Sequence, residues 1–433
     1  MKVCVVGLWH LGSVTAACLS SGGHQVYGLD FDAQVIDGLS QGKAPLFEPG
    51  LDELVQKGIQ AQTLRFTTDP ELAARDAAVI WLTYDTPVDE DDRADVDYVI
   101  ERMSRLFPYL QNGQEVLVSS QLPAGSCRRL QEMFEKAYPN QKTVGFSCSP
   151  ENLRLGKAIS VFTQPDRVVI GTRTEKSQAV FKELLSPFTD RIEWMGVESA
   201  EMTKHALNAF LATSVTFINE IAVLCEQVGA DAKEVERGLK TEARIGPKAY
   251  LGPGGAFAGG TLARDIAFLS QLGEKYQQPI HIFPAVKASN DAHKLWHLRH
   301  LEKSLGGVRG KTIAVWGLTY KPGTNTLRRS SAIELCQSLL AQGAKVQAHD
   351  PSLKTLPGEF SEIQLCASVD EAAQNADALV IATEWPDYKN VRLNETLQKM
   401  NNFLVLDANR FLAHEISSVT MEGVKYITIG KSS

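Results

Sequence analysis

One arrangement of residues occurs twice in this chain and limits the folds open to it. In the first copy, a run of β-branched and apolar residues over 2–6 ends at Gly7, and a stretch of helical periodicity follows through Ser21. A pair of glycines then stops the helix, and a second strand-like run over 25–29 ends at Asp30. Strand, glycine turn, helix and strand in this order predict a βαβ unit, which belongs to a parallel sheet.

The second copy lies in the C-terminal part of the chain. A strand-like run from Lys311 ends at Gly317, a helical segment follows over 331–342, and a further strand ends at Asp350. One repetition of the whole unit predicts a second doubly wound domain rather than a solenoid. The expected fold class is therefore α/β, with two doubly wound Rossmann-like domains.

A long segment of helical periodicity separates the two copies. Strand-like runs over 78–82 and 115–119 alternate with helical segments, which predicts a parallel sheet with helices on both faces in the first half. The segment over 201–228 predicts a long central helix that joins the domains and provides a dimer contact. We expect a dinucleotide-binding domain over 1–198, a central helical segment over 199–300 and a C-terminal domain over 301–433.

Composition and charge exclude several classes of protein. The 433 residues carry 44 Lys and Arg against 51 Asp and Glu, a net charge of −7 without a block of like charge, so we expect no nucleic-acid or membrane partner. Seven scattered cysteines without a C-x-x-C pair suit reduced thiols and indicate a cytoplasmic protein. The first apolar run contains a glycine turn, so we expect a strand rather than a signal peptide. Polar residues interrupt the apolar stretch over 206–224, which predicts a buried helix and not a membrane span.

The turn after the first strand resembles a dinucleotide-binding fingerprint with one departure. Its sequence is GLWHLG over 7–12, where the fingerprint is G-x-G-x-x-G. Gly7 permits the tight turn and Gly12 lets the helix pack on the strand, but Trp9 replaces the glycine that lets a pyrophosphate approach closely. Asp30 stands where a carboxylate holds a ribose 2′-hydroxyl, which indicates NAD rather than NADP.

Eight blocks of residues carry a resemblance that runs from end to end. They are APLFEPGLDEL (44–54), TP (86–87), SPENLRLGKAI (149–159), PDRVVIG (165–171), KHALNAFLA with FINEIA (204–222), RIGP (244–247), GLTYKPGT (317–324) and TEW (383–385). The sequence resembles the nucleotide-sugar 6-dehydrogenases, such as UDP-glucose and GDP-mannose dehydrogenase. This family implies a two-step oxidation of a sugar CH2OH to a carboxylate with two NAD per turnover, a nucleoside diphosphate held by the C-terminal domain, and a homodimer.

The resemblance implies roles for individual residues. The family's conserved glutamate matches Glu151, its central lysine matches Lys204, and the asparagine one turn later matches Asn208. On one helix face, the ammonium and the amide can stabilise a developing alkoxide and hold an aldehyde. Without the resemblance, Lys204 would be taken for an exposed helix lysine, because most lysines are exposed.

A loop that carries the nucleophile in this family differs here. The family has P-G-x-G-F-G-G-S-C-F-P-K-D, and residues 253–265 are PGGAFAGGTLARD. Thr261 therefore occupies the place of the catalytic cysteine, Arg264 that of a lysine, and Asp265 matches the family's aspartate. A cysteine thiolate adds to the aldehyde and leads to a thioester, but the threonine hydroxyl ionises far above neutral pH and is crowded by its β-branch.

Other departures point in the same direction. Gln121 replaces a threonine that the family associates with a proton-transfer water, and Ala256 and Ala258 replace glycines of the loop beside the sugar. The DANR and TNTLRRS segments also differ from the family pattern, although Arg328 is kept. These changes imply that the fold of the family is kept and that its thioester chemistry is altered.

The remaining residues implied by the resemblance bind ligands. Arg244 matches an arginine that reaches across the dimer to substrate phosphates, and Lys321 matches a lysine that holds the nucleotide end. The expected cofactor-binding residues are Gly7, Leu11, Gly12, Asp30, Thr86, Pro87, Gln121 and Arg328. The expected substrate-binding residues are Glu151, Leu153, Lys204, Asn208, Arg244, Tyr250, Phe257, Gly259 and Lys321, and the expected catalytic residues are Glu151, Lys204, Asn208, Thr261 and Asp265.

Two clusters are assigned no chemistry. His293, His297 and His300 have the spacing of a metal-binding helix face, but without an acidic or cysteine partner in the sequence pattern we expect an exposed helix and no metal. The acidic run over 89–92 predicts a solvated loop.

The expected function is NAD-dependent oxidation of a nucleotide-diphosphate sugar, with a UDP-sugar as the default. Because Thr261 replaces the nucleophile, the reaction stops after two electrons or serves an NAD-assisted epimerisation. The alternatives are complete oxidation to a uronate by a cysteine-independent route, and a non-catalytic paralogue that binds a nucleotide sugar.

Overall fold

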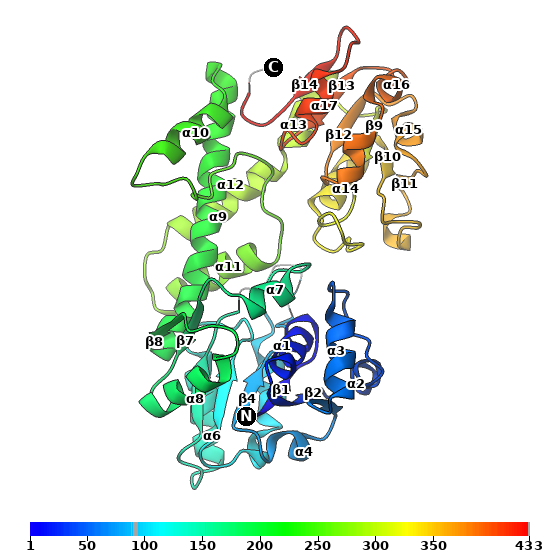
Figure 1. Ribbon diagram of the computed structural model, residues 1–433. Coiled ribbons are helices and arrows are strands. Elements are labelled where there is room, and N and C mark those ends of the chain that lie inside the picture. Colours follow the sequence, from blue (N-terminus) through cyan, green and yellow to red (C-terminus); the bar gives the residue numbers. More distant parts are fainter. Residues whose placement is uncertain (88, 90–93, 152, 432–433) are drawn as a thin grey trace. The chain divides into compact units, whose positions relative to one another are not determined.

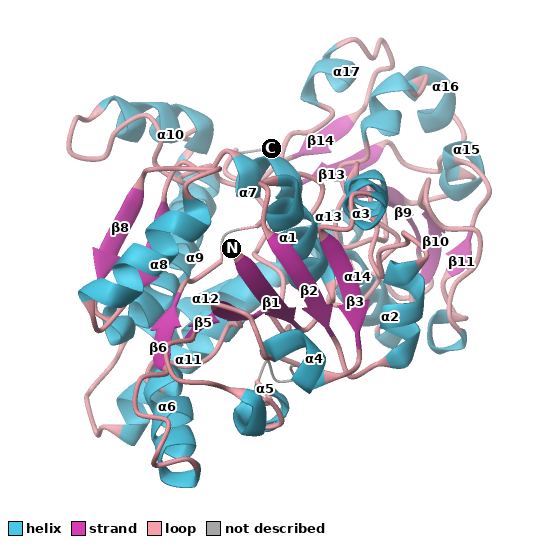
Figure 2. Cartoon of the chain, turned by 60° about the horizontal axis from the view of Figure 1, so that its bottom comes forward, coloured by secondary structure: helices cyan, strands magenta, loops and turns pink. Residues whose placement is uncertain are grey.

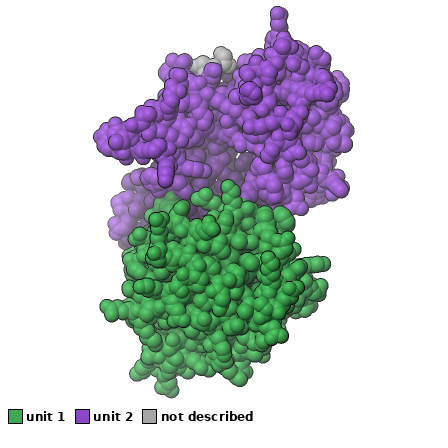
Figure 3. All heavy atoms as spheres, viewed as in Figure 1, with its two compact units in different colours: residues 1–207 green, residues 208–433 purple. Residues whose placement is uncertain are grey.

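The computed structural model describes residues 1–87, 89, 94–151 and 153–431. The chain divides into two compact units, residues 1–207 and 208–433 (Figure 3). The division falls inside the long helix α9 (Val197–Val228), which confirms the predicted central helix and extends its start. Glu90, Asp91 and Asp92 of the predicted acidic loop lie outside the described residues.

A sheet forms the centre of the first unit (Figure 1). It has eight strands in the order β3-β2-β1-β4-β5-β6-β7-β8. The strands from β3 to β6 are mutually parallel. β7 pairs antiparallel with β6 and parallel with β8, so the predicted parallel sheet is confirmed except at this junction. The strands are β1 (Lys2–Val6), β2 (Gln25–Leu29), β3 (Leu64–Thr67), β4 (Val79–Leu82), β5 (Glu115–Val118), β6 (Gly145–Cys148), β7 (Val168–Gly171) and β8 (Ile192–Met195).

Helices cover both faces of this sheet, because alternate residues of each central strand point to opposite sides. In β1, Val3 and Val5 pack in a core with side chains of α1 and α3, whereas Cys4 and Val6 pack with α5 and α6. The helices are α1 (His10–Ser21), α2 (Ala33–Ser40), α3 (Leu51–Gln60), α4 (Pro70–Ala74), α5 (Val96–Ser104), the 3-10 helix η1 (Phe107–Tyr109), α6 (Ser126–Ala137), α7 (Ala158–Thr163) and α8 (Glu175–Leu185).

The second unit contains a six-stranded parallel sheet in the order β11-β10-β9-β12-β13-β14. This order matches that of β3-β2-β1-β4-β5-β6, which is the doubly wound Rossmann order. Both predicted Rossmann-like sheets are therefore confirmed. The strands are β9 (Thr312–Trp316), β10 (Lys345–His349), β11 (Gln364–Leu365), β12 (Ala378–Ile381), β13 (Leu404–Asp407) and β14 (Lys425–Ile427).

Helices also flank the second sheet (Figure 2). Ile313 and Val315 of β9 pack in a core that includes Ala222 of α9, and Ala314 and Trp316 pack in the opposite core. The helices are α10 (Ala232–Thr241), α11 (Thr261–Lys275), α12 (Ile282–Lys294), α13 (Trp296–Leu305), α14 (Ser331–Ala341), η2 (Gly358–Phe360), α15 (Val369–Ala373), η3 (Pro386–Asn390), α16 (Leu393–Leu397) and α17 (Ala413–Ser417).

Helix α9 is long and apolar enough to cross a bilayer, which no other described helix is. Core helices of soluble proteins meet the same criterion, and 44% of its most apolar window is buried. The expectation of a buried helix is only partly correct, because Phe210, Phe217 and Leu224 are exposed.

The first and last glycines of the β1–α1 turn are required by packing. Gly7 has a φ of +91°, and a Cβ there would lie 2.8 Å from Tyr84 N. A Cβ on Gly12 would lie 1.8 Å from Gly7 O and 2.7 Å from Thr83 Oγ1. Helix α1 can therefore approach β1 only through a residue without a side chain.

We expect Gly12→Ala to lower the free energy of unfolding by about 1–3 kcal/mol, because the added methyl forces α1 away from the sheet. Urea denaturation measures the change. The control is Gly238→Ala in α10, where a Cβ meets nothing within 4 Å and the helix gains about 0.5–1 kcal/mol from reduced backbone entropy of the unfolded chain. Equal unfolding midpoints for the two variants would contradict the close contact.

Candidate functional site

The β1–α1 turn has the geometry of a dinucleotide site. The first N–H groups of α1 have no partners within the helix and carry its positive dipole end, which suits a pyrophosphate. Leu8 N donates to Asp30 Oδ2 at 2.7 Å, and Asp32 N donates to Asp30 Oδ1 at 3.1 Å, so the carboxylate is fixed at the end of β2. Each oxygen keeps a lone pair for a ribose hydroxyl. The residues present therefore fit NAD.

Trp9 is compatible with the backbone of this turn. Its φ of −70° lies in the range open to any residue, and the turn does not need glycine there for conformation. The Trp9 side chain is half-exposed and caps no N–H of α1. Leu11, two residues further on, is almost wholly buried in the core.

Three other expected cofactor residues lie at the ends of β4 and β5. Thr86, buried after β4, donates from Oγ1 to the carbonyl oxygen of Gln121 at 2.7 Å. Pro87 is exposed beside Thr86 and accepts from Asp95 N at 2.8 Å. The ends of β4 and β5 thus hold these residues together.

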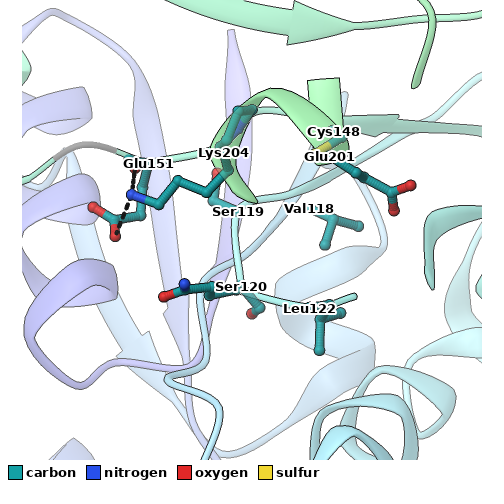
Figure 4. Close-up of a pocket in the computed structure, with 10 residues that line it drawn as sticks. Val118, Ser119, Ser120, Leu122, Cys148, Glu151, Glu201 and Lys204 are labelled. Carbon is teal, nitrogen blue, oxygen red and sulfur yellow. Dashed lines mark hydrogen bonds and ion pairs between the residues drawn. The ribbon is translucent and has the colours of Figure 1, made fainter. Parts of the chain in front are cut away.

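Lys204 is held against Glu151 rather than exposed to solvent. Its Nζ donates to the carbonyl oxygen of Glu151 at 2.6 Å and lies 3.8 Å from Glu151 Oε1 (Figure 4). The Lys204 side chain is 12% exposed, so the interpretation as an ordinary exposed lysine is wrong. Glu151 Oε2 accepts from Leu153 N at 2.7 Å, so three of the expected residues form one bonded group.

A small cavity adjoins this group. Its volume, counted as space open to the centre of a water molecule, is about 20 Å3, which is room for one water. Glu201, one turn before Lys204 on α9, accepts from Gly125 N at 2.7 Å and Cys127 N at 2.8 Å and caps α6. The lining residues are Val118, Ser119, Ser120, Gln121, Leu122, Cys148, Pro150, Glu151, Glu201 and Lys204.

In the second unit, Asn208 and Asp265 form a buried pair, with Asn208 Nδ2 donating to Asp265 Oδ2. Thr261 is the exposed first residue of α11, and Asp265 follows one turn later. The seven cysteines of the chain are buried, and the loop before α11 carries none of them. The position of the expected nucleophile therefore offers a hydroxyl and no thiol.

Four polar side chains hold the loop before α11: those of Asn219, Asn290 and Asn409, which the sequence did not single out, and that of His293. Asn219 Oδ1 accepts from Gly254 N at 3.0 Å, and His293 Nε2 bonds the carbonyl oxygen of the same residue at 2.9 Å. Asn409 Oδ1 accepts from Gly255 N at 2.8 Å. Asn290 bonds both backbone groups of Phe257, each at 2.9 Å. The backbone of the expected sugar-binding loop, which ends at Gly259 and Gly260, is thus fixed by α9, α12 and the segment after β13.

The remaining expected residues lie on loops of the second unit. Arg244 is exposed after α10 and donates from Nε to Glu242 Oε1 at 2.9 Å. Tyr250 is also exposed, whereas Lys321 is half-buried in the segment after β9 and Arg328 is exposed further along it. No ligand-binding role follows from their placement by itself.

The expectation of an exposed helix carrying three histidines is wrong. α12 ends at Lys294 and α13 begins at Trp296, so His293 and His300 lie on different helices. His293 is buried under the loop, and His300 Nε2 lies 3.1 Å from the acidic partner Glu226 on α9. In the described part of the chain, no three His, Cys, Asp or Glu side chains are grouped to hold a metal.

Comparison with known proteins agrees with the fold. Three family models match: the NAD binding domain of the UDP-glucose/GDP-mannose dehydrogenase family over residues 1–189, its central domain over 198–292 and its UDP binding domain over 314–414. UDP-glucose 6-dehydrogenase TuaD of Bacillus subtilis is 34% identical over 99% of this chain and 93% of the relative. UDP-glucose 6-dehydrogenase of Pseudomonas aeruginosa is 32% identical over 95% and 94%.

A solved structure extends the comparison. The UDP-glucose dehydrogenase of Pyrobaculum islandicum has a TM-score of 0.84 at 27% identity and covers 94% of this chain and 93% of its own. The dinucleotide-binding turn and these matches define an NAD-dependent oxidoreductase that acts on a sugar CH–OH group. The chain belongs to the UDP-glucose/GDP-mannose dehydrogenase family, and its substrate is a nucleotide sugar.

Burial of the histidines around α13 makes stability depend on pH. Desolvation, and then the charges of His293 and His300, lower the pKa of His297 to about 3. Desolvation also lowers the pKa of His293. In the unfolded chain these histidines take up protons near pH 6.5, whereas in the folded protein they stay neutral to a lower pH. Their contribution to the free energy of unfolding is therefore fully present above about pH 6.5 and is lost as the pH decreases below it.

We expect the free energy of unfolding to fall between about pH 7.5 and pH 5, a window above the titration of most carboxylates. His297→Phe removes the largest of these shifts and flattens the dependence, as urea denaturation at the two pH values measures. His414→Phe, at an exposed position, is the control and keeps the wild-type slope. Parallel slopes for both variants would show that His297 is not responsible.

Proposed function

We propose that this protein oxidises one hydroxyl of a UDP-sugar by two electrons and releases a carbonyl product. The observation that carries the proposal is the exposed hydroxyl of Thr261 at the position of the family's thiol, after a loop whose backbone is held at Gly254, Gly255 and Phe257. The names of the relatives, UDP-glucose 6-dehydrogenases, support UDP as the nucleotide. The family model for residues 314–414, a UDP binding domain, supports the same choice.

Lys204 and Asn208 have separate tasks in this proposal. Lys204, kept in place by the carbonyl oxygen of Glu151, has donors left to stabilise a developing alkoxide. The buried amide of Asn208, oriented by Asp265, holds the sugar oxygen that becomes a carbonyl. NAD, held by the α1 N-terminus and Asp30, supplies the acceptor for the hydride.

The second oxidation needs a nucleophile that Thr261 does not provide. In the thiol route, sulfur adds to the aldehyde, a hydride leaves the adduct, and water hydrolyses the thioester. A threonine alkoxide forms only with a strong general base, and Asp265, one turn away, is committed to Asn208. The reaction therefore stops at the carbonyl.

The protein also forms a homodimer through α9 in this proposal. Four large apolar side chains at intervals of seven, seven and four residues share one helix face and are 69%, 48%, 60% and 76% exposed: Phe210, Phe217, Leu224 and Val228. Such a stripe needs an apolar cover. The exposed Arg244 then reaches substrate phosphates of the partner subunit.

We further propose that the functional segments are 1–198, 199–300 and 301–433, and that the protein is cytoplasmic.

The electron count of the reaction tests the role of Thr261. We expect wild-type protein to form one NADH per UDP-sugar and a carbonyl product, measured by absorbance at 340 nm and mass spectrometry. Thr261→Cys adds the missing nucleophile, so it yields two NADH and a uronate. Thr261→Ser, which keeps a hydroxyl without the β-branch, is the control and yields one NADH.

Two outcomes would contradict this proposal. Two NADH and a uronate from wild-type protein mean that a cysteine-independent route completes the oxidation. Tight binding of UDP-sugar and NAD without NADH formation means that the protein is a binding paralogue.

The apolar stripe predicts the oligomeric state. Leu224→Glu places a charge in the centre of the proposed contact, so we expect light scattering to report monomers where the wild type is dimeric. Leu72→Glu, at an exposed leucine on α4, is the matched control and leaves the dimer intact. A monomeric wild type, or a dimeric Leu224→Glu variant, would refute the α9 interface.

A further inference from the structure

A single buried carboxylate ties together three segments of the first unit. Glu48, in the loop before α3, is 4% exposed. Its Oε2 accepts from His10 Nε2 at 2.9 Å and from Gly156 N at 2.7 Å, and its Oε1 accepts from Ala158 N at 2.8 Å. Burial raises the pKa of Glu48, but these bonds lower it more and keep the group ionised. Each contact is therefore a charge-assisted hydrogen bond, which fixes position more firmly than a neutral one.

The segments joined by Glu48 lead to the two ligands. His10 is the first residue of α1, at the helix end that suits the NAD pyrophosphate. Gly156 and Ala158 follow the loop that begins at Glu151. Glu151 in turn bonds Lys204 through its carbonyl oxygen. Leu153 N also donates to Glu151 Oε2 at 2.7 Å, so hydrogen bonds and the chain from 153 to 156 connect the dinucleotide turn with Lys204.

The path passes through one atom. His10 Nε2 and Gly156 N bond the same oxygen, Oε2, so a movement of His10 changes the position or strength of the Gly156 contact. A pyrophosphate held by the first N–H groups of α1 would act directly on its first turn, which includes His10.

We propose that Glu48 is a positioning residue that couples NAD binding at the β1–α1 turn to ordering of residues 153–158 and, through Glu151, of Lys204. The coupling itself concerns only the first unit and the cofactor. Its consequence for the sugar rests on the proposed function. By thermodynamic linkage, NADH and nucleotide sugar then strengthen each other's binding by the same factor.

Amide hydrogen exchange tests the coupling without any turnover. In wild-type protein, we expect saturating NADH to slow exchange in peptides that cover 153–158 by about fivefold or more. Glu48→Gln cannot accept all three bonds, because its NH2 faces N–H donors, so the NADH-induced slowing is lost. His10→Phe removes only the first link and keeps both backbone contacts of Glu48, so it also loses the slowing while the loop stays folded.

A matched control separates coupling from general loss of a buried carboxylate. Glu226 in the second unit accepts from His300 Nε2 at 3.1 Å, Trp296 Nε1 at 3.0 Å and Gly430 N at 2.9 Å. Glu226→Gln removes a comparable buried acceptor, and it keeps the NADH-induced slowing at 153–158. If wild-type protein shows no slowing, or if His10→Phe shows the wild-type slowing, the proposal is wrong.

Calorimetry adds a second measurement that distinguishes this proposal from the proposed function. UDP-glucose is titrated with and without NADH, and we expect the ratio of its two Kd values to be about fivefold or more in the wild type and near one in Glu48→Gln and His10→Phe. Equal ratios in all forms overturn the coupling alone. Absence of UDP-glucose binding counts against the proposed substrate, while hydrogen exchange still decides the coupling.

Discussion

One hydrogen bond occurs in both units, and the rest of each unit depends on it. The N–H group of the residue after the first strand's glycine donates to the aspartate that follows the second strand. Leu8 N donates to Asp30 Oδ2 at 2.7 Å, and Leu318 N donates to Asp350 Oδ2 at 2.8 Å. In both units the glycine has a positive φ, +91° at Gly7 and +87° at Gly317. The bond fixes the turn from which the following helix starts, and it sets the edge where neighbouring strands diverge and ligands bind. The carboxylates are therefore structural as well as available for a ligand.

The two turns diverge in the space beside the carboxylate. In the second unit, Trp385 Nε1 donates to Asp350 Oδ2 at 3.1 Å and to Thr319 Oγ1 at 3.2 Å, so an indole ring occupies the neighbourhood of the aspartate. In the first unit, Asp30 is bonded to backbone N–H groups and is only half-buried. The same repeat thus gives one turn suited to a dinucleotide and another closed by an aromatic side chain. This difference agrees with the separate NAD and UDP binding domains of the family.

Sequence patterns were sufficient where a local signal determines structure. The strands over 2–6 and 25–29 have the predicted limits, because apolar runs bounded by glycine admit few alternatives. Lys204 and Glu151 were found through resemblance, since 53 residues separate them and no local spacing joins them. The functions of Asn219, Asn290 and Asn409 were missed because an asparagine that holds a distant loop has no pattern of its own. The three histidines misled for the related reason that the break at Leu295 turns one apparent helix face into two.

The supports of the loop before α11 bear on how its missing thiol is interpreted. A buried N–H group without a partner costs free energy, so the side chains that bond this loop stabilise its position. Here Gly254, Gly255 and Phe257 all keep side-chain partners from α9, α12 and the segment after β13. The pair of Asn208 and Asp265 is buried and intact as well. A fixed loop that carries a hydroxyl at Thr261 is compatible with the proposed two-electron oxidation, which needs a positioned sugar but no thiol nucleophile.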